Sequence, residues 1–324
     1  MGKRVAHNKK YLYGPVSSRR LGRSLGIDIV PLKHCTLDCV YCQLGRTTEK
    51  TIERKDYVPV EAVLSELRDA LKKGLEADLS AARLADFITI SGSGEPTLNS
   101  RLGELINGIK KITDIPVAIM TNGTLLYRED VRADCAKADV VVPSLDASDE
   151  ASFQKVNRPH RDISIEKLVD GLVAFRKEFT GRIWLEVFLV EGLNTDIAEI
   201  DKIKGLIKRI RPDKVQLNTA VRPTADPAIK RVDAEKLEVI ARQIGEGCEV
   251  VADLPPRHSV KDMHSTSEDI LSMLKRRPCS LSDICSGLGI ARDEALKHIT
   301  ELRHQGLIGS EEKDGKTFFK ANSK

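Results

Sequence analysis

The sequence has few cysteines, few aromatic residues and no long apolar segment, and these shortages exclude several classes of protein. Seven cysteines in 324 residues are too few for a disulfide scaffold, and their number is odd. No apolar run approaches the roughly 18 residues needed to cross a bilayer, and the basic N-terminus lacks the apolar stretch of a signal peptide. A composition of 41% hydrophobic and 31% charged residues is too apolar for disorder. We expect a soluble, cytoplasmic protein of about two domains that does not associate with membranes.

The charge of the chain is nearly balanced overall but unevenly distributed. The chain has 52 Lys and Arg against 48 Asp and Glu, a formal net charge of +4. The first 27 residues contain seven Lys or Arg and no acid, so the remainder carries a net charge of −3. We therefore predict a basic N-terminal arm over residues 1–24, which favours RNA or another anionic substrate as its partner.

Between residues 25 and 253, apolar segments of the β type alternate with amphipathic helical patterns. This alternation predicts an α/β fold with a parallel sheet and right-handed crossovers. A doubly wound sheet and a barrel-like wrap both fit the pattern, and both bind ligands at the carboxyl ends of the strands. The predicted strands cover 25–30, 87–92, 117–123, 140–146, 183–190, 214–219 and 248–253, and the predicted helices cover 59–75, 101–112, 128–138, 164–178, 196–210 and 233–246.

The alternation ends at Leu254, and a polar linker is predicted over residues 254–267. Three helical patterns follow, and then two short strands around Asp314 and Gly315, a dipeptide typical of hairpin turns. Three helices and a hairpin predict a small winged-helix domain over residues 268–324. DNA is not the favoured partner, because residues 267–324 contain ten Lys or Arg and nine Asp or Glu. The three helices are predicted at 268–276, 281–288 and 292–305.

Three cysteines lie within eight residues, at Cys35, Cys39 and Cys42, with the spacing CxxxCxxC. Three thiols cannot pair into disulfides without leaving one over, but they can converge from a single loop. A structural zinc site takes four protein ligands, and only His34 lies nearby. A [4Fe–4S] cluster on three cysteines keeps one iron without a protein ligand, which makes that iron reactive. A zinc site completed by a distant residue, or three unrelated thiols, are the alternatives.

The segment CTLDCVYC resembles the signature of the radical S-adenosylmethionine (SAM) superfamily, which is CxxxCxφC with an aromatic φ, here Tyr41. Residues 91–97, SGSGEPT, resemble the family's Gly-Gly-Glu-Pro motif, with Ser93 in place of the first glycine. The resemblance covers about residues 10–250. It implies a partial (β/α)6 barrel of the radical SAM type.

The resemblance also implies a chemistry. A [4Fe–4S] cluster on Cys35, Cys39 and Cys42 would be reduced by a low-potential donor of the flavodoxin or ferredoxin type. It would then cleave SAM to methionine and a 5′-deoxyadenosyl radical, which abstracts hydrogen from an unidentified substrate. We predict no catalytic residues beyond the ligands of the cluster and of SAM.

Polar and glycine residues at the predicted carboxyl ends of the strands are the candidates for contacting SAM. Glycines allow close approach of the backbone, and Tyr41 suits the adenine. Because Glu186 alternates with apolar neighbours in its predicted strand, its side chain points either towards the interior of the barrel or outwards to a helix. For Gln216 and Asn218, which share one face of a strand, a buried hydrogen-bonded pair is the alternative. The predicted cofactor-binding residues are Tyr41, Gly92, Gly94, Glu95, Pro96, Asn122, Ser144, Asp146, Gln216 and Asn218.

Residues 13–26 are rich in Gly, Ser and Arg and resemble the N-terminal signature of a radical SAM group related to the tRNA-modifying wyosine synthases. The guanidinium groups of the arginines in this segment suit bidentate recognition of phosphate or carboxylate. The predicted substrate-binding residues are therefore Arg19, Arg20 and Arg23. The lack of any cysteine before Cys35 argues against a true wyosine synthase.

Two alternatives to a radical SAM enzyme of unassigned substrate follow from these features. One is a tRNA base-modifying enzyme, and the other, of a different class, is an iron–sulfur redox sensor whose winged helix regulates transcription. The Gly-Glu-Pro motif argues against the sensor, which needs no SAM pocket. The four cysteines outside the signature are predicted to be free, mostly buried thiols.

Overall fold

The computed structural model describes residues 11–76, 84–252 and 266–322. Eight strands form one sheet in the order β1-β2-β5-β6-β7-β8-β9-β10. All neighbouring pairs from β2 to β10 are parallel, and β1 runs antiparallel to β2. The strands are β1 (Leu12–Ser18), β2 (Gly22–Ile27), β5 (Phe87–Ile90), β6 (Val117–Met120), β7 (Val140–Val142), β8 (Arg182–Leu189), β9 (Lys214–Thr219) and β10 (Cys248–Val250).

The prediction of an α/β fold with a mostly parallel sheet is confirmed, and each of the seven predicted strands is present. Several end earlier than predicted, and after β7 the reason is Pro143, which has no N–H to donate to a neighbouring strand. The polar residues that we placed at the strand ends therefore lie on loops at the carboxyl edge of the sheet. This edge is where parallel sheets bind their ligands.

The first strand was missed. We predicted an arm over residues 1–24, but residues 12–18 form β1, which pairs with β2 through the register Leu12 to Ile27. The Gly, Pro and Ser content of this segment hides a strand that only its neighbour stabilises. Residues 1–10, with four of the seven basic residues of the predicted arm, lie outside the described part of the chain.

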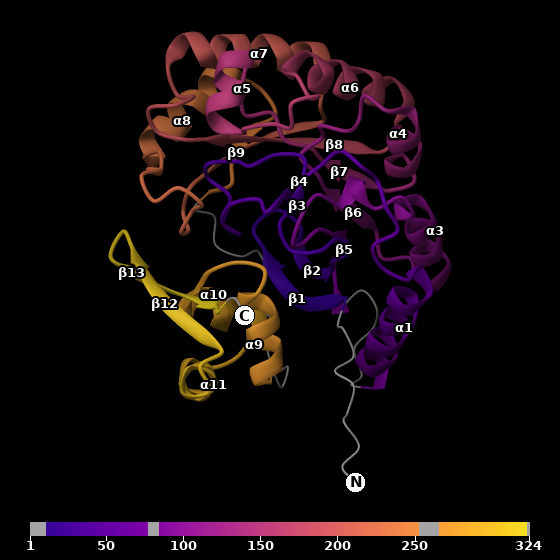
Figure 1. Cartoon of the computed structure of the whole chain (residues 1–324), viewed down its shortest axis with the longest axis vertical. Helices are drawn as coiled ribbons and strands as arrows, with labels where there is room; N and C mark the ends of the chain where they lie inside the picture. Colours follow the sequence, from indigo (N-terminus) through magenta and orange to yellow (C-terminus); the bar gives the residue numbers. More distant parts are fainter. Residues whose placement is uncertain (1–10, 77–83, 253–265, 323–324) are drawn as a thin grey trace.

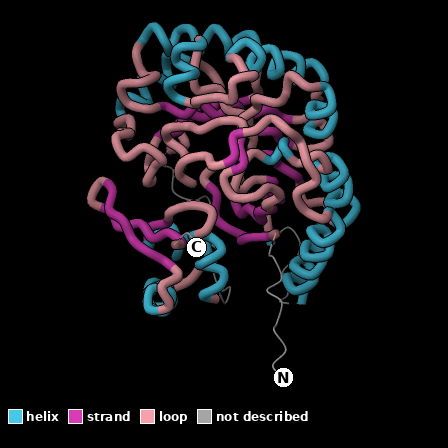
Figure 2. Tube along the Cα trace, in the orientation of Figure 1, coloured by secondary structure: helices cyan, strands magenta, loops and turns pink. Residues whose placement is uncertain are grey.

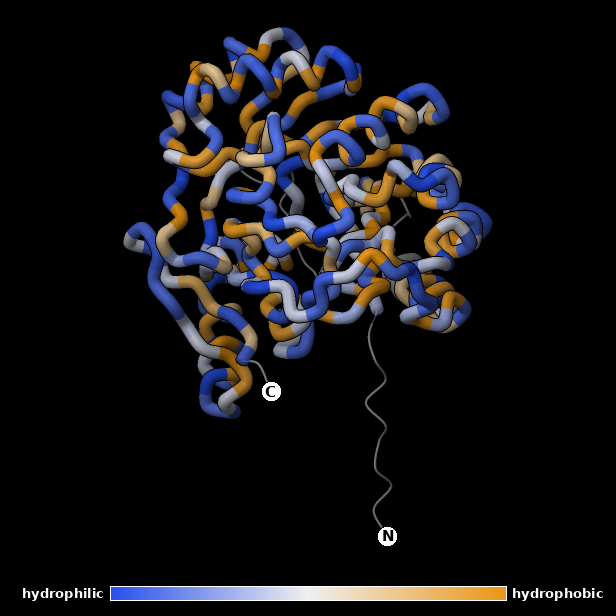
Figure 3. Tube along the Cα trace, turned by 45° about the horizontal axis from the view of Figure 1, so that its top comes forward, coloured by the Kyte–Doolittle hydropathy of each residue, from blue (hydrophilic) through white to orange (hydrophobic). Residues whose placement is uncertain are grey.

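Helices cover the outer side of the curved sheet, and the strands lie inside them (Figures 1 and 2). Apolar and hydrophilic stretches alternate along these helices (Figure 3), because each buries only one face. No helix among the described residues is long and apolar enough to cross a membrane. The helices are α1 (Val60–Glu76), α3 (Leu102–Ile112), α4 (Glu129–Cys135), α5 (Glu150–Val156), α6 (Ile165–Glu178), α7 (Ile197–Ile210) and α8 (Ala234–Ile244).

Helix α5 was not predicted, because its seven residues are too few to show a helical period. Its N-terminus is fixed by a capping box, in which the Asp149 side chain accepts from the Ser152 N–H. Three shorter elements also have no periodic signal. They are the strands β3 (His34–Cys35) and β4 (Glu49–Lys50), which pair with each other, and the 3-10 helix η1 (Pro96–Leu98).

The C-terminal residues form three helices and a three-stranded antiparallel sheet in the order β11-β13-β12. Asp314 and Gly315 both have positive φ, 49° and 71°, as the predicted two-residue hairpin requires. The apolar core of this part includes Val16 of β1, so it packs directly against the first strand of the large sheet. The predicted linker lies almost entirely within residues that are not described. The elements are α9 (Ser267–Leu274), β11 (Cys279–Ser280), α10 (Leu281–Leu288), α11 (Arg292–His304), β12 (Ile308–Lys313) and β13 (Lys316–Ala321).

One buried arginine ties the segment before α1 to η1 and α4. The side chain of Arg54 is 7% exposed and bonds to the carbonyl groups of Thr97 and Asn99 and to the carboxylates of Asp130 and Asp134. It therefore fixes the loop that follows β5.

Replacing this arginine tests its structural role. Arg54→Met leaves two carbonyl groups without their donor and Asp134 with only the weaker contact to Lys137 at 3.4 Å, so we expect the free energy of unfolding to fall by about 2–4 kcal/mol. Arg209→Met is the matched control, because Arg209 is 58% exposed and pairs with an equally exposed Asp170. That control should cost less than about 1 kcal/mol in urea denaturation. Equal losses for the two variants would contradict the role given to Arg54.

Candidate active site

The three signature cysteines lie on one loop, residues 35–42, which we call the cysteine loop. Backbone hydrogen bonds fix it on both sides: Glu95 N donates to His34 O at 2.9 Å, and Val40 N donates to Val156 O at 3.0 Å. All three thiols line one cavity of about 240 Å³, here called the cysteine cavity. The structure thus brings the predicted metal ligands together at the carboxyl edge of the sheet.

Two side-chain amides, on the buried Asn157 and the half-buried Asn122, face the sulfur atoms. Asn122 Nδ2 lies 3.5 Å from Cys35 Sγ, and Asn157 Nδ2 lies 3.4 Å from Cys39 Sγ. Donors directed at thiolate sulfur stabilise its negative charge and tune the potential of an iron–sulfur cluster. Asn122 was predicted at this site, whereas Asn157 was missed because it follows the unpredicted helix α5.

Burial keeps these thiols protonated in the absence of metal. It raises the pKa of Cys35 to about 12 and raises the pKa values of Cys39 and Cys42 as well. A metal centre would displace the protons, because its positive charge replaces them. Among the described residues, no three His, Cys, Asp or Glu side chains converge on the position of a single ion.

Glu95 is the polar centre of the Gly-Glu-Pro segment. It is 2% exposed and accepts four hydrogen bonds, from the N–H and hydroxyl of Thr97, the hydroxyl of Thr121 and the N–H of Asn122. Burial raises the pKa of this carboxyl group, and the four donors oppose that rise. Glu95 therefore holds the end of β6 against the loop that follows β5.

The preceding glycine is needed for a close approach. A Cβ atom at Gly94 would lie 2.1 Å from the carbonyl oxygen of His34, so no other residue fits beside the cysteine loop. Gly94, Glu95, Asn122 and Ser144 all line the cysteine cavity, as expected for residues that contact one cofactor. Pro96 is buried in η1 and lines neither cavity described here.

Asp146 occupies a different place from the one predicted. It accepts hydrogen bonds from the hydroxyl of Tyr41, from Asn157 Nδ2 at 2.8 Å and from Phe188 N at 2.8 Å. Burial raises the pKa of Asp146 to about 6. Because protein donors occupy its oxygens and it lines neither cavity, Asp146 positions Tyr41, whose ring stacks on Phe188 with centroids 3.8 Å apart.

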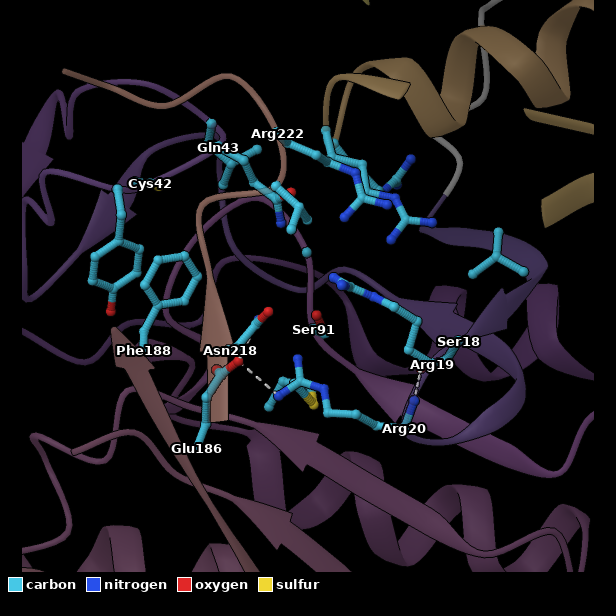
Figure 4. Close-up of a pocket in the computed structure, with 18 of the residues that line it drawn as sticks. Ser18, Arg19, Arg20, Cys42, Gln43, Ser91, Glu186, Phe188, Asn218 and Arg222 are labelled. Carbon is cyan, nitrogen blue, oxygen red and sulfur yellow. Dashed lines mark hydrogen bonds and ion pairs between the residues drawn. The ribbon is translucent and has the colours of Figure 1, made fainter. Parts of the chain in front are cut away.

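A second cavity, of about 370 Å³, adjoins the first and shares Cys39, Cys42 and Glu186 with it. We call it the arginine cavity (Figure 4). Glu186 points inward, where it pairs with Arg20 at 2.9 Å and accepts from Asn218 Nδ2 at 2.9 Å. The predicted residues that line this cavity are Arg19, Arg20, Tyr41, Gly92 and Asn218.

Two further predicted site residues line neither cavity. Gln216 lies three residues before the end of β9, where it is buried and donates to Glu249 at 2.8 Å. Arg23 pairs with Asp86 at 3.0 Å and lines neither cavity. All seven cysteines are free, and of the four outside the signature Cys135 and Cys279 are buried while Cys248 and Cys285 are half-buried.

Comparison with known sequences identifies relatives over nearly the whole chain. The sequence profile of the radical SAM superfamily matches residues 29–203. The UPF0026 protein of Methanocaldococcus jannaschii is 32% identical, with 96% of each chain covered. A protein of Brachyspira hyodysenteriae named GTPase Obg is 40% identical over 90% of this chain, which spans only 42% of that relative's length.

Solved structures share the fold at low identity. SuiB of Streptococcus suis, bound to its precursor peptide SuiA, superposes with a TM-score of 0.52 at 15% identity, over 69% of this chain and 48% of SuiB. A radical SAM methyltransferase of Sphaerobacter thermophilus gives a TM-score of 0.50 at 18% identity, over 70% of this chain and 65% of its own.

The environment of Glu95 predicts a specific loss on amide substitution. In Glu95→Gln, the amide NH2 must face at least one of the four donors that now meet a carboxylate oxygen. We expect the free energy of unfolding to fall by about 2–3 kcal/mol and SAM to bind roughly 10-fold more weakly in equilibrium dialysis. Glu129→Gln, on the exposed start of α4, should change neither value. Wild-type stability and affinity in Glu95→Gln would refute the role of this carboxylate.

Proposed function

Because this chain belongs to the radical SAM superfamily, we propose that it is an enzyme that generates a 5′-deoxyadenosyl radical and abstracts hydrogen from a substrate. The cofactors of this chain are a [4Fe–4S] cluster and SAM. When reduced, the cluster supplies the electron that cleaves SAM to methionine and the radical. The observation that carries the proposal is the convergence of all three signature thiols on one cavity that Gly94, Glu95 and Asn122 also line.

Each group of residues has a separate role in this proposal. Cys35, Cys39 and Cys42 hold three irons, while Asn122 and Asn157 donate to two of the sulfurs. The loop at Gly94 lies against the cysteine loop, where its backbone can meet the methionine end of SAM. Ser144, which follows β7, and Glu186, within β8, both line the cysteine cavity, where they would meet the ribose. Phe188 covers one face of Tyr41 and so restricts adenine to the remaining side. These roles are supported by the place that the residues take in or beside the walls of the two cavities.

The finer architecture is part of the proposal. Six strands, β2 and β5 to β9, follow one another in sheet order, which supports a partial (β/α)6 barrel. The order of helices and strands after residue 266 supports a winged-helix domain. We assign residues 12–250, from β1 to β10, to the radical SAM core and residues 268–324 to the second domain. Reduction is assigned to a low-potential donor of the flavodoxin or ferredoxin type.

A tRNA base-modifying enzyme is the second candidate function. The presence of Arg19 and Arg20 in the arginine cavity favours an anionic substrate, as the tRNA proposal requires. A redox-sensing transcription regulator is less well supported, because its cluster would need neither the glycine-lined approach to the cysteine loop nor a second cavity beside it.

A cysteine substitution tests the radical chemistry. In the protein reconstituted with iron and sulfide without oxygen, dithionite and SAM should yield 5′-deoxyadenosine, detected by liquid chromatography. Cys39→Ala should lose the cluster absorbance and at least about 100-fold of this product, because Cys39 has no replacement ligand. Cys248→Ala removes a half-buried thiol on β10, far along the sequence from the signature, and should retain both.

The same experiment can fail in an informative way. An intact, reduced cluster that yields no 5′-deoxyadenosine in the wild-type protein would exclude the enzyme proposed here. Cleavage by Cys39→Ala at the wild-type rate would exclude the assigned ligands.

A further inference from the structure

Five arginines from three separate parts of the chain line the arginine cavity. Arg19 and Arg20 come from the turn between β1 and β2, and Arg222 follows β9. Arg276 and Arg277 follow α9, in the C-terminal domain. In Figure 4, Arg19 and Arg222 extend into the cavity from different segments. The wall opposite these arginines includes Cys42 and Phe188, so the cavity adjoins the cysteine loop.

Two of the five guanidinium groups are neutralised within the protein. Arg20 pairs with Glu186 at 2.9 Å. Arg276 pairs with Asp28 at 3.3 Å and lies over the ring of Tyr13, 4.3 Å from its centroid. These two therefore leave no net charge in the cavity.

Of the other three arginines, Arg222 is the one with a carboxylate partner among the described residues. Arg222 pairs with Asp283 at 3.0 Å, and its Nε is buried without a hydrogen-bond partner. Arg19 donates to the carbonyl groups of Val251 and Ala252. Within the described part of the chain, neither Arg19 nor Arg277 has a carboxylate partner. Three positive charges against one negative charge give this group a net charge of about +2.

This excess of positive charge is unfavourable in the protein without a ligand. Burial, and then the neighbouring Arg222 and Arg20, lower the pKa of Arg19 to about 10. Burial and Arg277 likewise lower the pKa of Arg222. Arg277 is also buried, but the neighbouring Cys279 and Asp283 raise its pKa, so the repulsion falls mainly on Arg19 and Arg222. Like charges held close together in a partly buried site repel each other, and an anion between them removes that repulsion.

We infer that Arg19, Arg222 and Arg277 bind the phosphate group of a small substrate whose reacting carbon faces the cysteine loop. The C-terminal domain thus completes the substrate site, since it supplies Arg277 and also Asp283, which orients Arg222. This inference rests on the proposed radical chemistry only for the fate of the substrate; the phosphate site itself stands on the cavity and its charges.

The charge and shape of the site favour this class of ligand. A phosphate monoester carries about −1.5 to −2 at pH 7, which matches the excess of +2, whereas one carboxylate carries −1. Guanidinium forks bind phosphate oxygens in pairs. A volume of about 370 Å³ lies in the range of small-molecule sites. Residues of both domains line the cavity, and Lys313 of β12 bonds to the carbonyl of Arg222 at 3.0 Å, so the cavity lies at the junction of the two domains.

Binding of inorganic phosphate and pyrophosphate to the full-length reconstituted protein tests this site without SAM or reductant. Calorimetry at constant ionic strength should detect both ions, and both should raise the melting temperature, whereas acetate should do neither. Arg277→Gln and Arg19→Gln should each weaken phosphate and pyrophosphate binding by roughly 10- to 100-fold, because each loses charge-assisted hydrogen bonds. Arg303→Gln, an equal change of charge on the exposed side of α11, should bind like the wild type.

Circular dichroism and iron content establish that the variants are folded and carry the cluster. Wild-type affinity in both folded variants, or no binding of either ion by the wild type, would overturn the site. Binding of a 5′-phosphorylated RNA oligonucleotide without binding of pyrophosphate would overturn the small-substrate inference. Because SAM cleavage is measured separately, a wild-type protein that binds pyrophosphate but forms no 5′-deoxyadenosine refutes the proposed function and leaves the phosphate site standing.

Discussion

The backbone of the cysteine loop bonds to the segments on either side of it, and the geometry of the whole site follows from those bonds. His34 O accepts from Glu95 N, Val40 N donates to Val156 O, and Val40 O accepts from Asp226 N at 3.0 Å. Segments that follow β5, α5 and β9 therefore meet around one loop. These hydrogen bonds hold the loop that carries the three thiols in place beside the carboxyl edge of the sheet.

A second junction links the C-terminal domain to the same loop system. Asp28, just after β2, accepts from the hydroxyl of Ser93 at 2.5 Å and pairs with Arg276 of the C-terminal domain at 3.3 Å. One carboxylate thus connects the segment beside Gly94 with the domain that bounds the arginine cavity. The C-terminal domain buries its apolar core against Val16, so its helices serve the active site from outside the parallel sheet. Our proposal for the arginine cavity gives this part of the chain, which has almost no net charge, a function that does not require DNA.

Much of this structure follows from local sequence, and the remainder depends on contacts between distant residues. Short runs rich in Val and Ile, such as 140–142, predict buried parallel strands because few other structures bury them. The spacing of Cys35, Cys39 and Cys42 and the Gly-Glu-Pro motif place the site at the carboxyl edge of the sheet. The strand β1 has no such signal, because its sequence is rich in residues typical of turns. Its pairing with β2 stabilises it as a strand nevertheless. Arg222 and Arg277 lie in separate loops with no pattern around them, and only the docking of the two domains brings them together. Asp146 was assigned to the pocket from its place at a strand end, but its orientation depends on Tyr41 and Asn157, which a linear pattern cannot show.

Low-temperature electron paramagnetic resonance of the dithionite-reduced protein, recorded with and without SAM, tests most directly whether the cysteine loop holds a [4Fe–4S] cluster with one iron open to SAM. We expect the signal of a reduced [4Fe–4S] cluster whose g values shift when SAM is added, because SAM would bind the iron that no cysteine holds. A cluster signal that is identical with and without saturating SAM would show that SAM does not bind this iron.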